Sequence, residues 1–172
     1  RRMRHLGIPL INPTGGAPGR TVPAYGASIE ARLGVSTGIS AADRATTVRA
    51  AVAPDGSPAD LVMPGHVTPI QTARGGTLVS ASLAEAASDL ARLSGAGAEA
   101  VVSEVLGPEG NLASAAELEA LASAHGIPRV TITDVIHLRL RSDTLVRRVA
   151  EGMLPLRDGT VFRAIVYDNA ID

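Results

Sequence analysis

The strongest local constraint on this chain is a helix start preceded by a polar, glycine-containing loop, in the stretch 34–52. Ser40 is followed three positions later by Asp43. This is the spacing of a capping box, in which the serine hydroxyl accepts from a free backbone N–H and the carboxylate reaches back. The pair predicts a helix that begins near Ala41. The apolar residues that recur at helical spacing, and predict its buried stripe, are Ala41, Ala45, Val48 and Val52.

The loop before this helix brings polar groups to the helix N-terminus. Ser36 and Thr37 lie in it, and the first backbone N–H groups of a helix have no partner within the helix. Such an end can bind an anion, because the N–H groups and the helix dipole both favour negative charge. An ordinary capped helix has the same features and is the commoner case.

Helical and strand-like patterns alternate along the rest of the chain. Apolar spacing predicts helices at 82–94, 115–125 and 135–141, the first capped by Ser82 with Glu85 and the last by Asp134. Strand-like runs occupy 24–31, 73–79, 100–106, 130–133 and 161–167. The Gly- and Pro-rich stretch 12–20 predicts a mobile loop. This alternation predicts an α/β fold with a mixed sheet and packed helices.

Two titratable side chains stand out from their surroundings. His66 follows Pro64 and Gly65 and is itself followed by Pro69, so we expect it on a rigid loop outside regular structure. Glu104 interrupts the apolar run 100–106, where an unpaired carboxylate would cost free energy. For a lone histidine, a structural or merely exposed role is the commoner interpretation.

Composition narrows the classes of protein. The 172 residues include no cysteine, which excludes a disulfide framework, a thiol nucleophile and a Cys-based metal site. Sixteen basic and 17 acidic residues give a net charge of −1, so no general field attracts nucleic acid or anionic lipid. We find no apolar run long enough to span a membrane and no signal-peptide pattern, and expect a cytoplasmic protein. Because the chain begins with Arg1, we expect it to be part of a longer protein.

Three motifs, in order, carry a resemblance to a known family. They are the stretch 37–51 (TGISAADRATTVRAA), the run 64–67 (PGHV) and the run 75–78 (GGTL). The chain resembles 3,4-dihydroxy-2-butanone 4-phosphate synthase, a riboflavin-pathway carbon–carbon lyase. The resemblance implies conversion of the sugar phosphate D-ribulose 5-phosphate to 3,4-dihydroxy-2-butanone 4-phosphate and formate, Mg²⁺ or Mn²⁺ as cofactor, and a homodimer.

The same resemblance assigns roles to individual residues. His66 and Glu104 match the catalytic acid/base groups, while Thr37, Ser40 and Asp43 match residues that shape the substrate pocket. We therefore predict that His66 and Glu104 lie close together in one pocket.

The chain departs from the family pattern in the segment 80–85. There the resembled family has a substrate-binding arginine and a metal-binding histidine, at the positions held here by Ser80 and Leu83. Only Glu85 survives from that motif, and with Ser80 it stays a candidate substrate-binding residue. The family's acidic metal-binding loop is absent from these 172 residues. We therefore expect Leu83 and Ala84 to pack, and predict no tight divalent-metal site.

The end of the chain resembles a different enzyme. The stretch 145–172 is similar to the join and opening strands of GTP cyclohydrolase II, as in bifunctional riboflavin-pathway proteins. This divides the chain into a partial synthase-like domain at 1–141 and, at 142–172, a linker with the first strands of a second domain. Three hypotheses remain open: a synthase impaired by loss of its metal-binding histidine, a degenerate scaffold or dimerisation domain, and a recruited sugar-phosphate enzyme.

Overall fold

The computed structural model describes residues 2–11, 23–169 and 171. The chain divides into two compact units, Arg1–Thr72 and Ala73–Asp172. The stretch 12–20, for which we predict a loop, lies outside the described residues. No helix in the described part of the chain is both long and apolar enough to cross a membrane.

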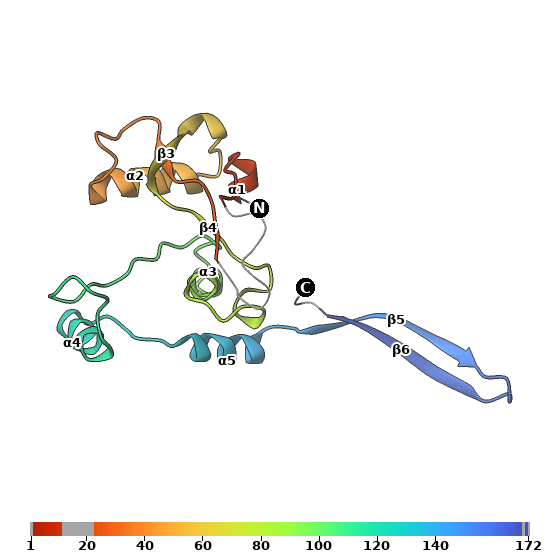
Figure 1. The fold of residues 1–172 in the computed structure, drawn as a ribbon. Helices are drawn as coiled ribbons and strands as arrows, with labels where there is room; N and C mark the ends of the chain where they lie inside the picture. Colours follow the sequence, from red (N-terminus) through yellow and green to blue (C-terminus); the bar gives the residue numbers. More distant parts are fainter. Residues whose placement is uncertain (1, 12–22, 170, 172) are drawn as a thin grey trace. The chain divides into compact units, whose positions relative to one another are not determined.

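The first unit packs one long helix on a short antiparallel ladder (Figure 1). Its elements are α1 (Arg2–His5), β1 (Ala24–Tyr25), β2 (Ile29–Ala31), α2 (Ala41–Val52), the 3-10 turn η1 (Pro58–Asp60), β3 (Leu61–Val67) and β4 (Ile70–Gln71). Strand β1 pairs with β4 and β2 pairs with β3, both antiparallel. The predicted strand 24–31 is therefore two short strands. The core of this unit consists of Leu6, Ile8, Ile29 and Leu61.

Helix α2 begins at Ala41, as the capping signal predicts, but buries a different face. Asp43 and Thr47 are buried, whereas Val52 is 44% exposed, so the predicted apolar stripe is wrong. The reason is that both polar side chains find partners. The Thr47 hydroxyl accepts from the Ala31 N–H at 3.0 Å and donates to the carbonyl of Asp43 at 3.1 Å. A buried polar group that is hydrogen-bonded in this way does not carry the penalty of an unpaired one.

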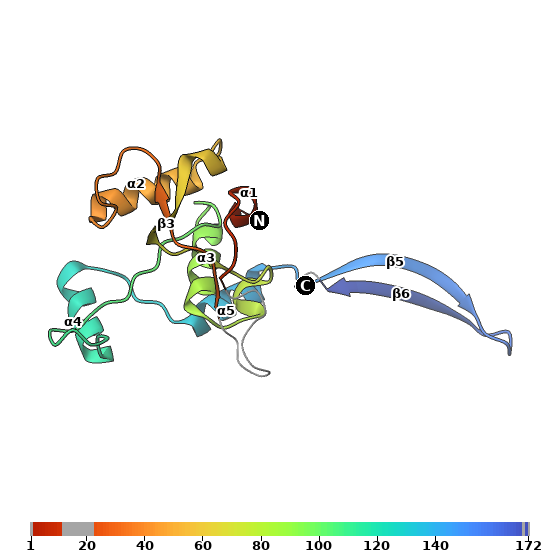
Figure 2. The same cartoon turned by 45° about the horizontal axis from the view of Figure 1, so that its top comes forward.

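The second unit contains the remaining helices and a long hairpin (Figures 1 and 2). Its elements are the 3-10 turn η2 (Gly76–Leu78), α3 (Leu83–Leu93), α4 (Ala115–His125), α5 (Ile132–Ser142), β5 (Val146–Pro155) and β6 (Val161–Asn169). Helix α3 packs against α5 and η2. The helices at 82–94 and 115–125 and the strand at 161–167 are confirmed, and the α/β class is correct. Every sheet among the described residues consists of two antiparallel strands.

Three predicted strands of the second unit are wrong. The stretch 73–79 forms the turn η2, because Gly76 adopts a left-handed φ of 58°. The stretch 130–133 instead begins α5, whose N-terminus is closed by a capping box between Thr131 and Asp134. The stretch 100–106 forms no strand among the described residues, and only Leu106 makes an isolated bridge, to Leu112.

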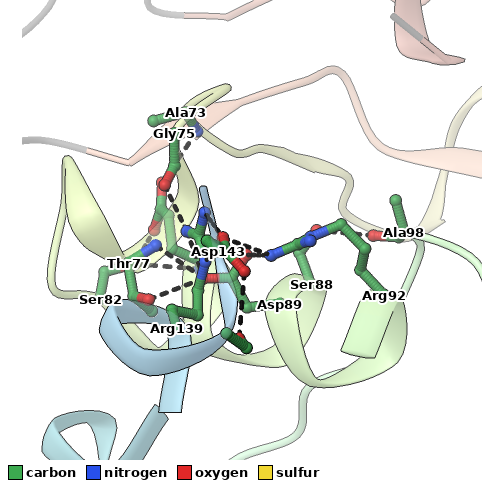
Figure 3. A network of polar contacts seen from close by, with 12 residues as sticks. Ala73, Gly75, Thr77, Ser82, Ser88, Asp89, Arg92, Ala98, Arg139 and Asp143 are labelled. Atoms are coloured by element: carbon green, nitrogen blue, oxygen red, sulfur yellow. Dashed lines mark hydrogen bonds and ion pairs between the residues drawn. The ribbon is translucent and has the colours of Figure 1, made fainter. Parts of the chain in front are cut away.

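A buried ionic network joins η2, α3 and α5 (Figure 3). The Asp89 carboxylate accepts from the Thr77 N–H and hydroxyl, at 2.9 and 2.7 Å, and from the Arg139 guanidinium at 3.0 Å. Arg139 also donates to the carbonyl of Gly75 and to the Asp143 carboxylate. Asp89 is 4% and Arg139 is 7% exposed, so each charge is buried with its partners. The network fixes the turn that leads into the segment 80–85.

Candidate functional site

In the first unit, His66 lies on strand β3 and faces a carboxylate. Its Nδ1 is 2.7 Å from Oε2 of Glu30 on the neighbouring strand β2. The Glu30 side chain is 15% exposed and that of His66 is 42% exposed, so the pair lies at the edge of solvent. Among the described residues, Nε2 of His66 has no hydrogen-bond partner. The imidazole is thus held by one nitrogen and free at the other.

The prediction that His66 lies outside regular structure is wrong, although the ladder is irregular there. The register shifts between Ile29 and Glu30, so that Val67 pairs with Ile29 and Val62 pairs with Glu30. The four residues 63–66 therefore bulge opposite a single step of β2. A methyl group on Gly65 would overlap the backbone of Ile29 and Glu30, which explains why glycine precedes the histidine.

The loop before α2 lies against this pair. Gly38 has a left-handed φ of 76°, and a methyl group there would overlap the Glu30 carboxylate. The Gly38 N–H donates to Asp43 at 3.1 Å, and so do the hydroxyl and the N–H of Ser36, at 3.0 and 3.3 Å. Burial raises the pKa of Asp43, but these hydrogen bonds outweigh it and the pKa lies below its ordinary value. Asp43 therefore holds the loop as a carboxylate.

Ser40 and Thr37 have different environments in this loop. The Ser40 hydroxyl accepts from the Asp43 N–H at 3.0 Å and is the N-cap of α2, as predicted. Among the described residues, the Ser40 backbone N–H makes no hydrogen bond to the Asp43 carboxylate, so the predicted capping box is only half formed. Thr37 is exposed, and the loop thus presents its side chain beside a capped helix N-terminus.

In the second unit, Glu85 serves its own helix. It is 7% exposed, and its carboxylate accepts from the Ala73 N–H at 3.1 Å and from the Ser82 hydroxyl. Ser82 caps α3, as predicted. Ser80 lies half-buried just before the helix, with its N–H bonded to the carbonyl of Gly76 at 3.0 Å. Leu83 is 73% exposed, so the prediction that it packs is wrong.

Glu104 occupies an exposed segment of the second unit that lies outside regular structure. The prediction that it interrupts a buried strand is wrong, because neither it nor its apolar neighbours are buried. Its carboxylate accordingly carries no desolvation cost in this structure. Burial therefore gives no reason to single out Glu104 as a site residue.

The residues at the positions that the resemblance assigns to a metal have few free ligand atoms for a divalent ion. Leu83 has no lone pair, and both oxygens of Glu85 already accept hydrogen bonds, one from the Ala73 N–H before η2 and one from the Ser82 hydroxyl at the start of α3. No group of three or more His, Asp or Glu side chains gathers in the described ranges of the chain in a way that could hold a metal. Hard cations such as Mg²⁺ need several oxygen ligands, counting water.

Sequence reasoning missed Glu30. The sequence pattern that could have indicated Glu30 is its place between the apolar residues Ile29 and Ala31. Both neighbours are buried, and strand alternation turns Glu30 to the opposite face. Its pairing with His66 depends on the register shift in β3, for which no local pattern exists.

Known proteins match the chain over most of its length. The sequence model of the 3,4-dihydroxy-2-butanone 4-phosphate synthase family matches residues 1–138. A protein of that name from Pseudomonas syringae pv. tomato is 44% identical over 169 residues, which are 98% of this chain and 45% of the relative.

Two solved structures have similar folds. A two-domain 3,4-dihydroxy-2-butanone 4-phosphate synthase from A. baumannii has a TM-score of 0.80 and 36% identity, covering 98% of this chain and 48% of its own. A synthase in complex with two magnesium ions has a TM-score of 0.65 and 31% identity, covering 82% and 70%. The chain thus spans a little under half the length of the Pseudomonas relative. It belongs to the 3,4-dihydroxy-2-butanone 4-phosphate synthase family.

Proposed function

We propose that this chain carries the acid/base part of a sugar-phosphate site for the family reaction, and that its turnover of D-ribulose 5-phosphate is impaired. That reaction yields 3,4-dihydroxy-2-butanone 4-phosphate and formate. The observation that carries the proposal is the 2.7 Å contact between Nδ1 of His66 and Oε2 of Glu30. A histidine held by a carboxylate at one nitrogen is oriented to exchange a proton at the other.

The proton chemistry follows from this arrangement. Enolisation of a ketose removes a proton from a carbon beside the carbonyl, and a general base must lie within hydrogen-bond reach of it. Glu30 accepts from Nδ1–H, which leaves Nε2 of His66 as the acceptor. The Glu30 carboxylate then stabilises the imidazolium that forms.

The loop before α2 is suited to hold the phosphate. The N–H groups of Ala41 and Ala42 belong to the first turn of α2 and have no intrahelical acceptor. With the exposed Thr37 hydroxyl they supply neutral donors at a helix N-terminus, where phosphate is favoured. Asp43 acts indirectly in this proposal, because its carboxylate is occupied in bracing Ser36 and Gly38.

The segment 80–85 is the basis for impairment. Ser80 has no guanidinium with which to clamp substrate oxygens, and Leu83 cannot bind a cation. Glu85 is buried in the cap of α3. The same segment favours a second candidate function, because it lacks the arginine and the histidine that the resemblance leads us to expect. In this alternative the chain is a degenerate scaffold or dimerisation domain beside a second domain at 142–172.

Formate release tests the proposal. We expect the complete protein to release formate slowly from D-ribulose 5-phosphate with Mg²⁺ present, and the His66→Gln variant to lose that activity by about 10²-fold or more. The Glu30→Gln variant should lose turnover with little change in KM. His125→Gln is the matched control, since His125 is exposed at the end of α4. No formate from the unmodified protein, or equal loss in His125→Gln, would favour the scaffold.

A further inference from the structure

The hairpin β5–β6 has two chemically different faces. Cross-strand partners on one face are Ala150 with Val166, Gly152 with Ala164, and Leu154 with Phe162. We call these six residues the apolar face. The opposite face carries the ion pairs of Glu151 with Arg148 and Arg163, beside Met153, Val161, Ile165 and Tyr167. The first face also carries an ion pair, of Arg147 with Asp168, but only at its end beyond Ala150 and Val166.

The apolar face has large side chains at its ends and small ones in the middle. Leu154, Phe162 and Val166 are 53, 54 and 53% exposed. Gly152 and its partner Ala164 leave a shallow centre between them. Such a surface lets the backbone of a packing element approach closely at the centre while the larger residues contact its flanks.

An uncovered face of this kind is unfavourable for a hairpin. A two-stranded ribbon is at best marginally stable in water and needs further strands or a packed element. Contiguous exposed apolar surface rimmed by polar residues is typical of an interaction site. On the opposite face the ion pairs of Glu151 with Arg148 and Arg163 lie among the apolar side chains, whereas the six residues of the apolar face are uninterrupted by charge.

The matches to known proteins indicate what covers the apolar face. The family's sequence model ends at residue 138, before β5 begins at Val146. The magnesium-bound synthase covers 82% of the chain, whereas the two-domain synthase covers 98% and has about half of its own length left over. The hairpin is therefore shared with a two-domain protein and lies beyond the synthase domain itself.

We propose that the apolar face of β5–β6 is the docking surface for the remainder of a second domain, of the kind that makes up the other part of two-domain relatives. The occupant presents aliphatic side chains to these six residues, because none of the six offers a charge or a hydrogen-bonding side chain to a polar group. This inference rests on the proposed division of the chain at residue 142. It does not depend on turnover.

Hydrogen exchange of a chimera tests the docking surface. In the chimera this chain replaces the matched segment of the Pseudomonas syringae relative, so that the rest of that protein is present. We expect amides of β5 and β6 to exchange fast in the 172-residue chain, and at least about 100-fold more slowly in the chimera, as for a packed element.

Two matched valine variants identify the face. Val166 lies on the apolar face and Val161 on the opposite one, and each is 53% exposed. In the chimera, Val166→Asp should abolish the added protection and Val161→Asp should keep it. Far-UV circular dichroism and the exchange of α3 serve as folding controls for both variants.

Four results would overturn the proposal. The first is that the two variants change hydrogen exchange of the hairpin equally, and the second is that the hairpin amides of the monomeric 172-residue chain are already fully protected. The third is that protection of these amides in the 172-residue chain rises as the chain forms dimers. The fourth is a folded chimera in which the hairpin amides gain no protection. The third would assign the face to a second copy. Formate release is measured separately, so failure of the proposed function and failure of this docking surface are distinguishable.

Discussion

Arg139 shows how a single residue can hold a segment that carries no catalytic group of its own. Its guanidinium bonds the carbonyl of Gly75 and the carboxylates of Asp89 and Asp143. Arg92 approaches the same two carboxylates, at 3.7 and 3.5 Å, but its side chain is 46% exposed. The two arginines therefore share partners but differ in burial. Because a buried charge pair costs more to break than an exposed one, we expect Arg139 to contribute more to the free energy of unfolding than Arg92.

We expect Arg139→Met to lower the free energy of unfolding by about 3–5 kcal/mol, because the Asp89 charge would stay buried without its cation. Arg92→Met should cost less than about 1 kcal/mol, as for an exposed pair. Urea unfolding of both variants measures the difference. Similar losses in the two would contradict the assignment of the buried network to Arg139.

At the scale of elements, the helices of this chain are defined by their N-termini. Capping boxes close η1, α4 and α5, through Asp60, Glu117 and Asp134 respectively. Backbone and side-chain hydrogen bonds from Ser114 hold the pKa of Glu117 below its ordinary value, and Thr131 does the same for Asp134. These carboxylates are consequently more acidic in the folded chain than in the unfolded one.

The sign of the pH dependence follows from that shift. A group whose pKa is depressed by folding stabilises above its unfolded-state pKa, and the stabilisation is lost as the pH falls through the folded-state value. We expect stability to decline below about pH 5, and the Glu117→Gln/Asp134→Asn double variant to show a shallower decline. Thermal unfolding from neutral to acid pH measures the slopes. Glu109→Gln, in an exposed turn, is the control, and an unchanged slope in the double variant would contradict this account.

The segment before α3 allows a test of restoration. Since Leu83 is 73% exposed, a histidine there displaces no packed neighbour. Leu83→His should therefore leave stability nearly unchanged, within about 0.5 kcal/mol, as for a surface substitution. The restored variant adds Ser80→Arg and Ala84→Thr, at half-buried positions. In a protein that also carries the family's acidic loop, we expect formate release to rise.

Magnesium titration separates the outcomes of restoration. We expect weak, non-saturating heats from the unmodified protein and a saturating site in the restored one. A stoichiometric site in the unmodified protein that disappears in Glu85→Ala or Glu104→Ala would contradict our interpretation of this segment. Restored binding without a rise in formate would show that the pocket differs elsewhere.

At the scale of the whole molecule, the residues that the sequence marks for one site belong to different units. Thr37, Ser40, Asp43 and His66 lie in Arg1–Thr72, while Ser80, Glu85 and Glu104 lie in Ala73–Asp172. Within the first unit, His66 contacts Glu30 directly, and Gly38, whose N–H donates to Asp43, lies against the Glu30 carboxylate. The convergence of His66 with Glu104 stays a prediction.

Cysteine pairs can test that convergence, because the chain has no native cysteine. We expect the His66→Cys/Glu104→Cys variant to be crosslinked by a short bis-maleimide, either within one chain or between the chains of a homodimer. The mass of the product distinguishes the two cases. His66→Cys with Arg157→Cys, in the β5–β6 turn, is the control pair. Equal crosslinking of both pairs, or none of the first, would remove Glu104 from the proposed site.

Local sequence determined the helix starts of this protein. Ser40, Ser82 and Ser114 begin helices because a side-chain cap acts within three residues of the N–H that it satisfies. The three motifs in 37–51, 64–67 and 75–78 likewise indicated the family. Both kinds of information are contained in short stretches of chain.

Tertiary structure alone decided which faces are buried and what His66 contacts. Thr47 is buried because the Ala31 N–H, 16 positions away, needs an acceptor, and Leu83 is exposed although it continues an apolar pattern. Glu30 meets His66 because the ladder shifts register by several residues between Val62 and Val67. Periodicity describes the spacing of side chains within one element, whereas burial and pairing depend on partners supplied by another.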